Sequence, residues 1–315
     1  MVALSATGAT FGSYAFAQPF RLQVTRYAIS PRGWPRGLRL RLAVIADLHV
    51  IDPWMSLPRV AQIVARTNAL EPDAVLLLGD YLPNTGMQRW ANRIGGGIIP
   101  PEDWSRELGR LRAPLGVHAV LGNHDWWEDD AAQRRGCGPL QAGLALERSG
   151  ISVYENNAVR LNKQGTPFWM AGLGDQAALF TDVSHRERGF AMGAKPMTDG
   201  DRYAGVDDLA GTLQQVTDDA PVILMAHEPD IFAEMGDMGD RVSLTVCGHT
   251  HGGQVRLLNY APIVPSRYGR RFTYGHIVED GRHLVVSAGL GCSGLPIRFG
   301  APPEIVMIEV GGESA

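Results

Sequence analysis

The feature that most constrains this fold is a set of short apolar runs, each followed directly by Asp, His or Asn residues. Residues 39–46 (RLRLAVIA) lead into Asp47 and His49, and residues 74–78 (AVLLL) lead through one glycine into Asp80. A short, wholly apolar run is typical of a strand buried on both faces of a sheet. Because strand ends in an open α/β sheet converge on one edge, these polar residues are expected to meet in space.

Three later apolar runs end in the same way. Residues 117–121 precede a Gly-Asn-His-Asp segment, residues 222–225 precede Ala-His, and residues 244–247 precede Gly-His-Thr-His. The glycines let the backbone turn sharply beside such a site. Together the five segments supply nine candidate site residues: Asp47, His49, Asp80, Asn123, His124, Asp125, His227, His249 and His251.

The rest of the chain alternates between helix and strand patterns, which predicts an α/β sandwich with the site at the carboxyl ends of the strands. Helices are predicted over residues 57–70, 102–111, 131–150 and 205–216. Further strands are predicted over 20–29, 158–161, 168–171 and 305–310, with a hairpin of 274–278 and 283–287. Residues 83–101 are predicted to form a loop or cap, and 181–205 an irregular insertion beside the substrate pocket.

The ligand types in the five segments are carboxylate, imidazole and amide oxygen, without a thiolate. This set suits Mn, Fe, Zn or Mg at a catalytic centre better than a structural zinc. A carboxylate can bridge two cations about 3.5–4 Å apart, the clamp used in phosphoryl chemistry. The pair His124-Asp125 fits a further need, since an imidazole can protonate a leaving oxygen while a carboxylate fixes its tautomer.

In this order, across residues 40–255, the five segments resemble the motif blocks of the calcineurin-like metallophosphoesterase superfamily. One such block alone would be weakly specific, whereas five in order are highly specific. The resemblance implies a four-layer fold of two mixed β-sheets flanked by helices. It also implies hydrolysis of a phosphoester by a hydroxide held between two divalent metal ions, with Mn favoured.

The resemblance further implies two groups of metal ligands joined by Asp80, which would bridge both ions. His124 would face the scissile phosphate as general acid or charge stabiliser, and Asp125 would orient it. The first group of ligands is Asp47, His49 and His251, and the second is Asn123, His227 and His249.

A finer resemblance lies in residues 248–255 (GHTHGGQV) and 289–305 (GLGCSGLPIRFGAPPEI). These are similar to a bacterial branch that is often membrane-anchored or exported and includes phosphodiesterases and UDP-2,3-diacylglucosamine hydrolases. The latter carry a longer acidic pattern after Gly-Asp, where this chain has Tyr81-Leu82-Pro83. The favoured substrate is a lipid- or nucleotide-linked phosphodiester or pyrophosphate. The alternatives are a phosphomonoesterase or protein phosphatase and a non-catalytic metal-binding scaffold.

Charge and cysteine usage exclude other classes of protein. The 29 Lys and Arg against 33 Asp and Glu give a formal net charge of -4, without the basic excess expected of a nucleic-acid-binding protein. Three cysteines without CxxC spacing speak against a disulfide framework or a structural zinc cluster. The expected partner is a small-molecule or lipid-linked phosphoester and not a nucleic acid. Peripheral association with a membrane is also expected. The sequence carries no signal for oligomeric state.

The first 19 residues contain no charged side chain and are small and apolar. They are interpreted either as the remnant of an export signal or membrane anchor, or as an arm packed on the surface. The chain is accordingly divided into an N-terminal arm, residues 1–30, and a metallophosphoesterase domain, residues 31–315. A membrane-associated or periplasmic location is favoured, with a cytoplasmic location as the alternative.

Two arginines, Arg271 and Arg298, are candidates for binding substrate because a guanidinium matches phosphate oxygens. Trp126 and Trp127 directly follow His124-Asp125. They are interpreted equally as an aromatic wall beside the phosphate or as packing of a loop on the core. The histidines outside the five segments are interpreted as surface or structural residues: His118, His185, His276 and His283.

Overall fold

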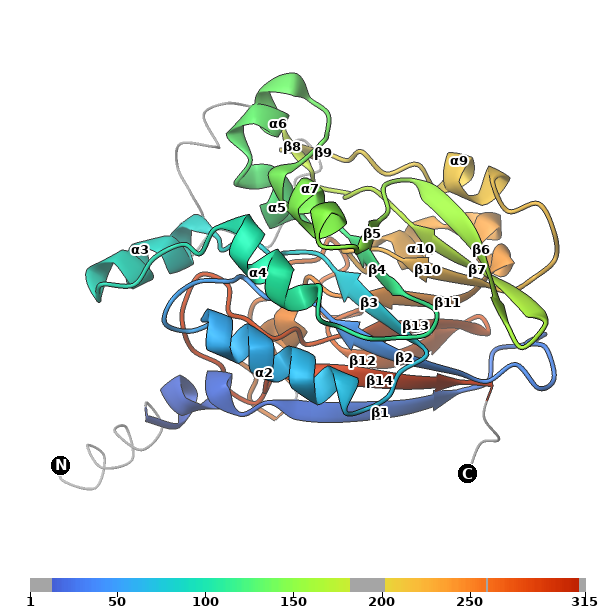
Figure 1. Ribbon diagram of the computed structural model, residues 1–315, viewed down its shortest axis with the longest axis horizontal. Helices are drawn as coiled ribbons and strands as arrows, with labels where there is room; N and C mark the ends of the chain where they lie inside the picture. The colour runs from blue at the N-terminus through green and yellow to red at the C-terminus, as the bar shows by residue number, and fades with distance from the viewer. Residues whose placement is uncertain (1–12, 182–201, 259, 312–315) are drawn as a thin grey trace.

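The computed structural model describes residues 13–181, 202–258 and 260–311, and it contains two six-stranded sheets (Figure 1). In the first sheet β2, β3, β4 and β5 are parallel, β14 runs antiparallel to β2, and β1 runs parallel to β14. In spatial order its strands are β1 (Gln23–Ile29), β14 (Glu304–Val310), β2 (Leu40–Ile45), β3 (Ala74–Leu78), β4 (Val117–Val120) and β5 (Ser152–Val153).

The second sheet has four parallel strands at its centre, β7, β10, β11 and β13, with an antiparallel strand on each edge. The predicted hairpin across Asp280-Gly281 forms one of these edges. In spatial order its strands are β12 (Gly275–Glu279), β13 (Arg282–Val286), β11 (Val242–Cys247), β10 (Val222–Met225), β7 (Thr166–Gly172) and β6 (Asn157–Lys163).

Alternation along β2 shows how the layers are built. Leu42 and Val44 face an apolar cluster between the two sheets, whereas Ala43 and Ile45 face a cluster under the helices. This alternation is the two-residue period of a strand whose two faces are both covered. The helices over the first sheet include α2 (Leu57–Asn68), α4 (Pro101–Leu108) and α7 (Gln141–Arg148), and those on the outer face of the second sheet include α9 (Leu209–Gln214) and α10 (Ile231–Glu234) (Figure 1).

The order of helix, sheet, sheet and helix makes four layers, so the predicted α/β sandwich is confirmed. The chain also forms several short helices. These are α5 (Asn123–Trp127), α6 (Asp130–Arg135) and the 3₁₀ turns Gln18–Phe20, Gly236–Arg241 and His251–Gly253.

Residues 83–101, predicted as a loop or cap, contain a helix, so that prediction is wrong in part. The helix α3 (Thr85–Arg93) follows Asn84, whose side chain accepts a hydrogen bond from the backbone N–H of Met87 at 2.9 Å. Met87 and Ala91 are its only buried residues, one turn apart. Two apolar anchors within nine residues are too few to produce a readable helical period.

The single helix predicted over residues 131–150 is also wrong, because the chain forms two helices there. The first, α6, ends at Gly136, which has a left-handed backbone with φ 69°. Pro139 then lacks the N–H that a continuous helix would need, and α7 starts at Gln141. The helix predicted over residues 205–216 is shortened to α9.

Part of the predicted N-terminal arm belongs to the first sheet. Residues 1–12 lie outside the described residues, but β1 pairs with β14 along all seven of its residues. The backbone N–H of Arg298 also donates to the carbonyl of Ala15 at 3.1 Å. Of the predicted insertion, residues 182–201 lie outside the described residues. The strand β8 (Leu179–Phe180), just before the insertion, pairs with β9 (Tyr203–Ala204) near its end.

The packing of the two sheets predicts a large effect at Phe168, which is fully buried in the cluster between them. Phe168→Ala should lower the free energy of unfolding by about 3–5 kcal/mol, because it removes aromatic packing and leaves a cavity. Val159→Ala, on the adjacent strand β6 at a 36% exposed position, should change it by less than about 0.5 kcal/mol. Urea unfolding followed by tryptophan fluorescence measures both; equal losses would contradict the two-sheet core.

Candidate metal centre

The structure brings all seven predicted metal ligands to the carboxyl ends of five strands. Each ligand is buried and lies within four residues of the strand that positions it. The strands β2, β3 and β4 come from the first sheet, and β10 and β11 from the second. They supply, in chain order, Asp47, His49, Asp80, Asn123, His227, His249 and His251.

The first cluster consists of Asp47, His49, Asp80 and His251, whose donor atoms all lie within 4.8 Å of one another. Nε2 of His49 lies 3.0 Å from Nε2 of His251 and 3.5 Å from Oδ2 of Asp80. Nε2 of His251 lies 3.8 Å from Oδ1 of Asp47. Metal–ligand bonds of about 2.0–2.2 Å place neighbouring ligand atoms about 3–3.5 Å apart, so this cluster fits one cation.

The second cluster contains Asp80, His227 and His249, and Asn123 joins it through its amide oxygen. Nδ1 of His249 lies 3.0 Å from Oδ1 of Asn123 and 3.2 Å from Nε2 of His227. Nε2 of His227 lies 3.4 Å from Oδ2 of Asp80. The same oxygen of Asp80 thus faces a histidine of each cluster, which is the position of a bridging carboxylate.

Hydrogen bonds on the far side of the imidazoles fix which nitrogen faces the centre. Nδ1 of His49 lies 2.8 Å from the carbonyl of Leu82, and Nδ1 of His227 lies 2.6 Å from the carbonyl of Leu78. A carbonyl partner holds the proton on Nδ1 and leaves the Nε2 lone pair toward the cluster. The backbone therefore sets both tautomers in the form that binds a metal.

Burial favours the neutral form of two ligand imidazoles. It lowers the pKa of His49 to about 4 and that of His249 to about 3, so neither has to lose a proton before it binds a cation at neutral pH. At His227 burial acts in the same direction, but the carboxylate of Asp80 outweighs it and raises the pKa well above its ordinary value. Burial also raises the pKa of Asp47 to about 7, and its Oδ2 has no hydrogen-bond partner among the described residues. A buried carboxylate oxygen without a partner is costly, and a divalent cation would satisfy it.

Five ligands adopt a left-handed backbone, with φ between 43° and 69°. Non-glycine residues rarely adopt this conformation, and its strain persists only where the surroundings enforce it. Glycines provide the necessary space: a Cβ on Gly122 would lie 2.5 Å from Oδ1 of Asp80, and one on Gly79 would lie 2.5 Å from the backbone N of Gly122. The five ligands are Asp47, His49, Asp80, His249 and His251.

His124 lies beside the metal ligands, as expected, with its ring centroid 5.2 Å from that of His49. Its backbone N–H donates to Oδ1 of Asp80 at 2.8 Å. Its ring nitrogen Nδ1 is buried and has no hydrogen-bond partner among the described residues. Oε1 of Glu128 lies 3.7 Å from Nδ1.

Asp125 does not orient His124, which corrects the role expected from the sequence. Its two carboxylate oxygens accept hydrogen bonds of 2.9–3.1 Å from backbone N–H groups. Asp125 therefore holds the loop that carries Asp80, and its carboxylate oxygens bind backbone N–H groups where an imidazole partner was expected. Sequence reasoning missed Glu128, although it stands four residues after His124, where helical spacing brings side chains together. The four donors are Asp80, Tyr81, Leu82 and Gly122.

The two tryptophans differ in their surroundings. Trp126 is buried in the cluster under the helices and packs as a core residue. Trp127 contacts His124 edge-on, with ring centroids 4.9 Å apart, and stacks on Tyr203 at 4.8 Å. Phe180 completes this aromatic group. Both interpretations of the pair therefore apply, packing to Trp126 and a wall beside His124 to Trp127.

The two candidate arginines have other partners. Arg298 is fully buried and donates to the carbonyls of Ala288, Gly291 and Ala301. Its Nη2 also lies 3.2 Å from Nδ1 of His251, so Arg298 holds a ligand loop from behind. Arg271 is half-exposed and forms a bidentate ion pair with Glu279 at 2.9 and 2.6 Å. These pairings give no support to a role in binding phosphate.

Three further histidines within the described residues lie outside the two clusters. His118 is buried and contacts the hydroxyl of Tyr154 at 2.9 Å. His276 and His283 contact each other at 2.9 Å across the hairpin of β12 and β13. His185 lies outside the described residues.

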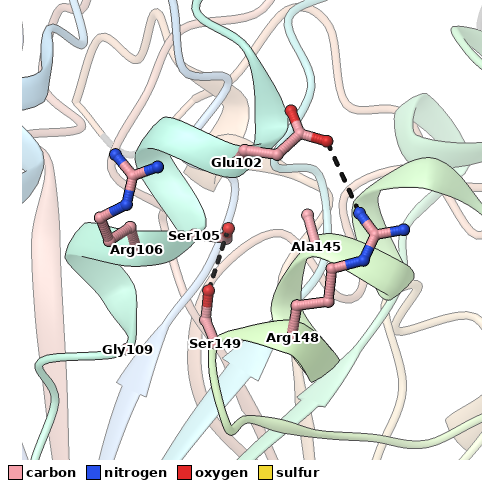
Figure 2. A pocket seen from close by; sticks show the side chains of 7 residues that line it. All are labelled: Glu102, Ser105, Arg106, Gly109, Ala145, Arg148 and Ser149. Atoms are coloured by element: carbon pink, nitrogen blue, oxygen red, sulfur yellow. Dashed lines mark hydrogen bonds and ion pairs between the residues drawn. The ribbon is translucent and has the colours of Figure 1, made fainter.

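A hollow of about 360 Å³ lies between α4 and α7 (Figure 2). Its lining includes Ser105 and Ser149, whose hydroxyls are 3.1 Å apart, and an ion pair of Glu102 with Arg148 at 3.7 Å. None of the metal ligands lines it. The candidate metal centre is therefore separate from this hollow.

The chain belongs to the calcineurin-like phosphoesterases, a family that its sequence matches over residues 40–253. It is therefore a hydrolase that acts on phosphoester bonds. It is 28% identical to the uncharacterized metallophosphoesterase YkuE of Bacillus subtilis, over 95% of this chain and 89% of the relative. It is 24% identical to the phosphodiesterase YaeI of Escherichia coli, over 97% of this chain and 94% of the relative.

A third relative is a transmembrane protein with metallophosphoesterase domain from Danio rerio, which is 25% identical over 97% of this chain and 60% of the relative. Within residues 13–181, 202–258 and 260–311, the structure contains no helix that is long and apolar enough to cross a bilayer.

The close approach at Gly122 predicts that a single methyl group disrupts the centre. Gly122→Ala should lose most of its bound metal, because its Cβ would displace the Asp80 carboxylate that both clusters share. Gly97→Ala is the control, since a Cβ there meets nothing within 4 Å. Elemental analysis of both purified variants after loading with Mn measures the effect; full metal content in Gly122→Ala would contradict this geometry.

Proposed function

We propose that this protein is a phosphodiesterase that uses two divalent metal ions, with Mn favoured. One observation carries the proposal: Oδ2 of Asp80 is shared by two clusters of buried ligands, and His124 stands beside them without belonging to either. A structural metal site needs no such additional imidazole. The donor set of carboxylate, imidazole and amide oxygen is compatible with Mn, Fe, Zn or Mg.

When bound, the two ions would supply a hydroxide nucleophile and neutralise the phosphate oxygens. The residues of the protein position the ions and supply a proton. Asp80 sets the spacing of the two ligand groups, and the carbonyls of Leu82 and Leu78 hold two imidazoles in the binding tautomer. His124 faces the same centre and donates a proton to the leaving oxygen as the phosphorus–oxygen bond breaks.

A diester is favoured over a monoester as substrate. The relative YaeI, which this chain matches over nearly its full length, is named a phosphodiesterase. The competing function is a phosphomonoesterase or protein phosphatase. Hydrolysis of bis(p-nitrophenyl) phosphate compared with p-nitrophenyl phosphate separates the two, and a preference for the monoester would overturn the diesterase proposal.

A lipid- or nucleotide-linked phosphate, as in the UDP-2,3-diacylglucosamine hydrolases, is the proposed substrate class. An exposed loop after the ligand His251 supports the lipid-linked form. This apolar loop exposes Leu258 by 95% and Leu257 by 62%, and Tyr260 and Ile263 are also more than half exposed. Exposed apolar side chains close together in sequence are typical of a surface that contacts another molecule or a membrane.

Cations flank the apolar loop. Arg270 lies over the ring of Tyr260 at 4.4 Å, and the side chain of Arg256 lies at the start of the loop over Tyr274 at 4.7 Å. Apolar side chains combined with arginines suit a bilayer with anionic headgroups. We therefore favour peripheral association with an anionic membrane, at a site where a lipid-linked phosphate would reach the metal ligands.

The ligand assignments predict that two variants separate metal binding from turnover. Asp80→Ala should lose both metals and nearly all activity, because one carboxylate serves two ions. His124→Ala should keep its metal and slow turnover by about 10²–10⁴-fold, the scale of lost acid–base catalysis. Elemental analysis and kcat on bis(p-nitrophenyl) phosphate measure the pair. Loss of metal from His124→Ala would contradict its assignment as a non-ligand.

The membrane proposal predicts that the apolar loop drives binding to vesicles. The double variant Leu257→Ser/Leu258→Ser should bind phosphatidylglycerol vesicles at least about tenfold more weakly, because each buried leucine contributes about 1.5–3 kcal/mol. Val278→Ser, at a 53% exposed position of the hairpin, should bind like the parent protein. Co-sedimentation measures all three proteins. Unchanged binding by the double variant, or no binding by the parent, would overturn the proposal.

A further inference from the structure

Glu128 lies close to the imidazole of His124. It follows α5, and its Oε1 is 3.7 Å from Nδ1 of His124, the buried ring nitrogen that has no hydrogen-bond partner within the described residues. The backbone N–H of Glu128 donates to the carbonyl of His124 at 3.1 Å, which keeps the two residues one helical turn apart. Both side chains therefore start from a fixed backbone geometry.

The carboxylate of Glu128 is held from its other side by α3. Nε2 of Gln88 donates to Oε2 of Glu128 at 3.2 Å, and the hydroxyl of Thr85 lies 3.5 Å from Oε1. Gln88 is itself anchored, because the same Nε2 donates to the carbonyl of Pro83 at 2.8 Å. These contacts restrict the rotation of Glu128 and keep an acceptor oxygen beside the imidazole.

The other carboxylates near His124 are already occupied. Asp125 accepts four backbone hydrogen bonds, and Oδ1 of Asp80 accepts the backbone N–H of His124 itself. Oδ2 of Asp80 faces the two metal clusters. Glu128 is thus the carboxylate that the geometry leaves for Nδ1.

We propose that Glu128 is the positioning residue of His124, and this inference rests on the proposed role of His124 as proton donor. Glu128 accepts the proton on Nδ1 in a hydrogen bond and so directs Nε2 toward the phosphate. The present separation of 3.7 Å shortens when substrate binds, since such contacts are often long before the substrate arrives. Because α3 holds Glu128, that helix acts on the reaction through Gln88.

The proposed chemical step is hydrolysis of the phosphoester bond. The oxygen of a water molecule forms the new bond to phosphorus, and the bond to the leaving oxygen breaks with its electron pair on that oxygen. Nε2 of His124 gives its proton to the leaving oxygen, which departs as an alcohol. Nδ1–H stays hydrogen-bonded to Glu128 throughout, and the proton lost by the water later restores His124.

A double-mutant cycle tests the inference on the Mn-loaded, full-length protein. Diphenyl phosphate is the substrate, because phenol departs less readily than p-nitrophenol and needs the proton more. Glu128→Ala should lower kcat by about 10- to 100-fold, the scale found for groups that orient a reacting ligand. KM should stay within about twofold, since the lost interaction acts in the transition state. In the His124→Ala background, Glu128→Ala should have no further effect on kcat.

The leaving group provides a second measurement that a purely structural role would not change. The loss of kcat in Glu128→Ala should be smaller on bis(p-nitrophenyl) phosphate than on diphenyl phosphate. Gln88→Ala should reproduce the same dependence with a smaller loss, because it removes only the support of Glu128. Glu147→Ala, an exposed glutamate on α7, is the matched control and should behave like the parent protein.

The outcomes distinguish this inference from the proposed function. If His124→Ala is slow and Glu128→Ala matches the parent, the role of Glu128 is wrong and the proposed function stands. If His124→Ala keeps full activity, the proposed role of His124 fails first. An equal loss from Glu128→Ala in both backgrounds, or a loss of bound metal, would assign Glu128 to the fold and overturn the inference.

Discussion

The carboxylate of Asp125 is the interaction on which the rest of the centre depends. It accepts hydrogen bonds from three consecutive residues, Asp80, Tyr81 and Leu82, and from Gly122 on the neighbouring strand end. Without it, several buried N–H groups would lack an acceptor, and each unsatisfied group is costly. Through this one side chain, the loop that carries the shared ligand is tied to the turn that carries Asn123 and His124. The carbonyl of Leu82, in the same loop, is hydrogen-bonded to the imidazole of His49. Asp125 therefore also helps to position a ligand of the first cluster.

This arrangement explains why the ligands can tolerate strained backbones. Five of them are left-handed, a conformation that costs on the order of 1–3 kcal/mol per residue. The buried sheets on both sides supply the rigid frame, because the strands that precede the ligands are apolar on both faces. The glycines at positions 79 and 122 let the two loops approach within a distance that any Cβ would prevent.

The sequence predicted which residues meet at the strand ends, because the signals for this are local. A buried strand followed at once by Asp, His or Asn is readable in a few residues, and parallel strand ends must share an edge. It did not predict the partners of those residues. Asp125 and Glu128 are both acids near His124, and only their orientation decides that one binds backbone and the other faces the imidazole. Likewise α3 depends on the N-cap at Asn84 and on two buried residues, and neither feature produces a helical hydrophobic period in the sequence.

The net charge of the candidate ligands bears on the kind of substrate that the site can bind. Of the seven candidate ligands, only Asp47 and Asp80 carry carboxylates. The others are an amide and four imidazoles, and an imidazole is neutral when it binds a cation. Two divalent cations would therefore exceed the negative charge of their ligands, and the guanidinium of Arg298, buried behind His251, adds to that excess. An anion would complete the balance, and phosphate suits it because its oxygens can bind both ions.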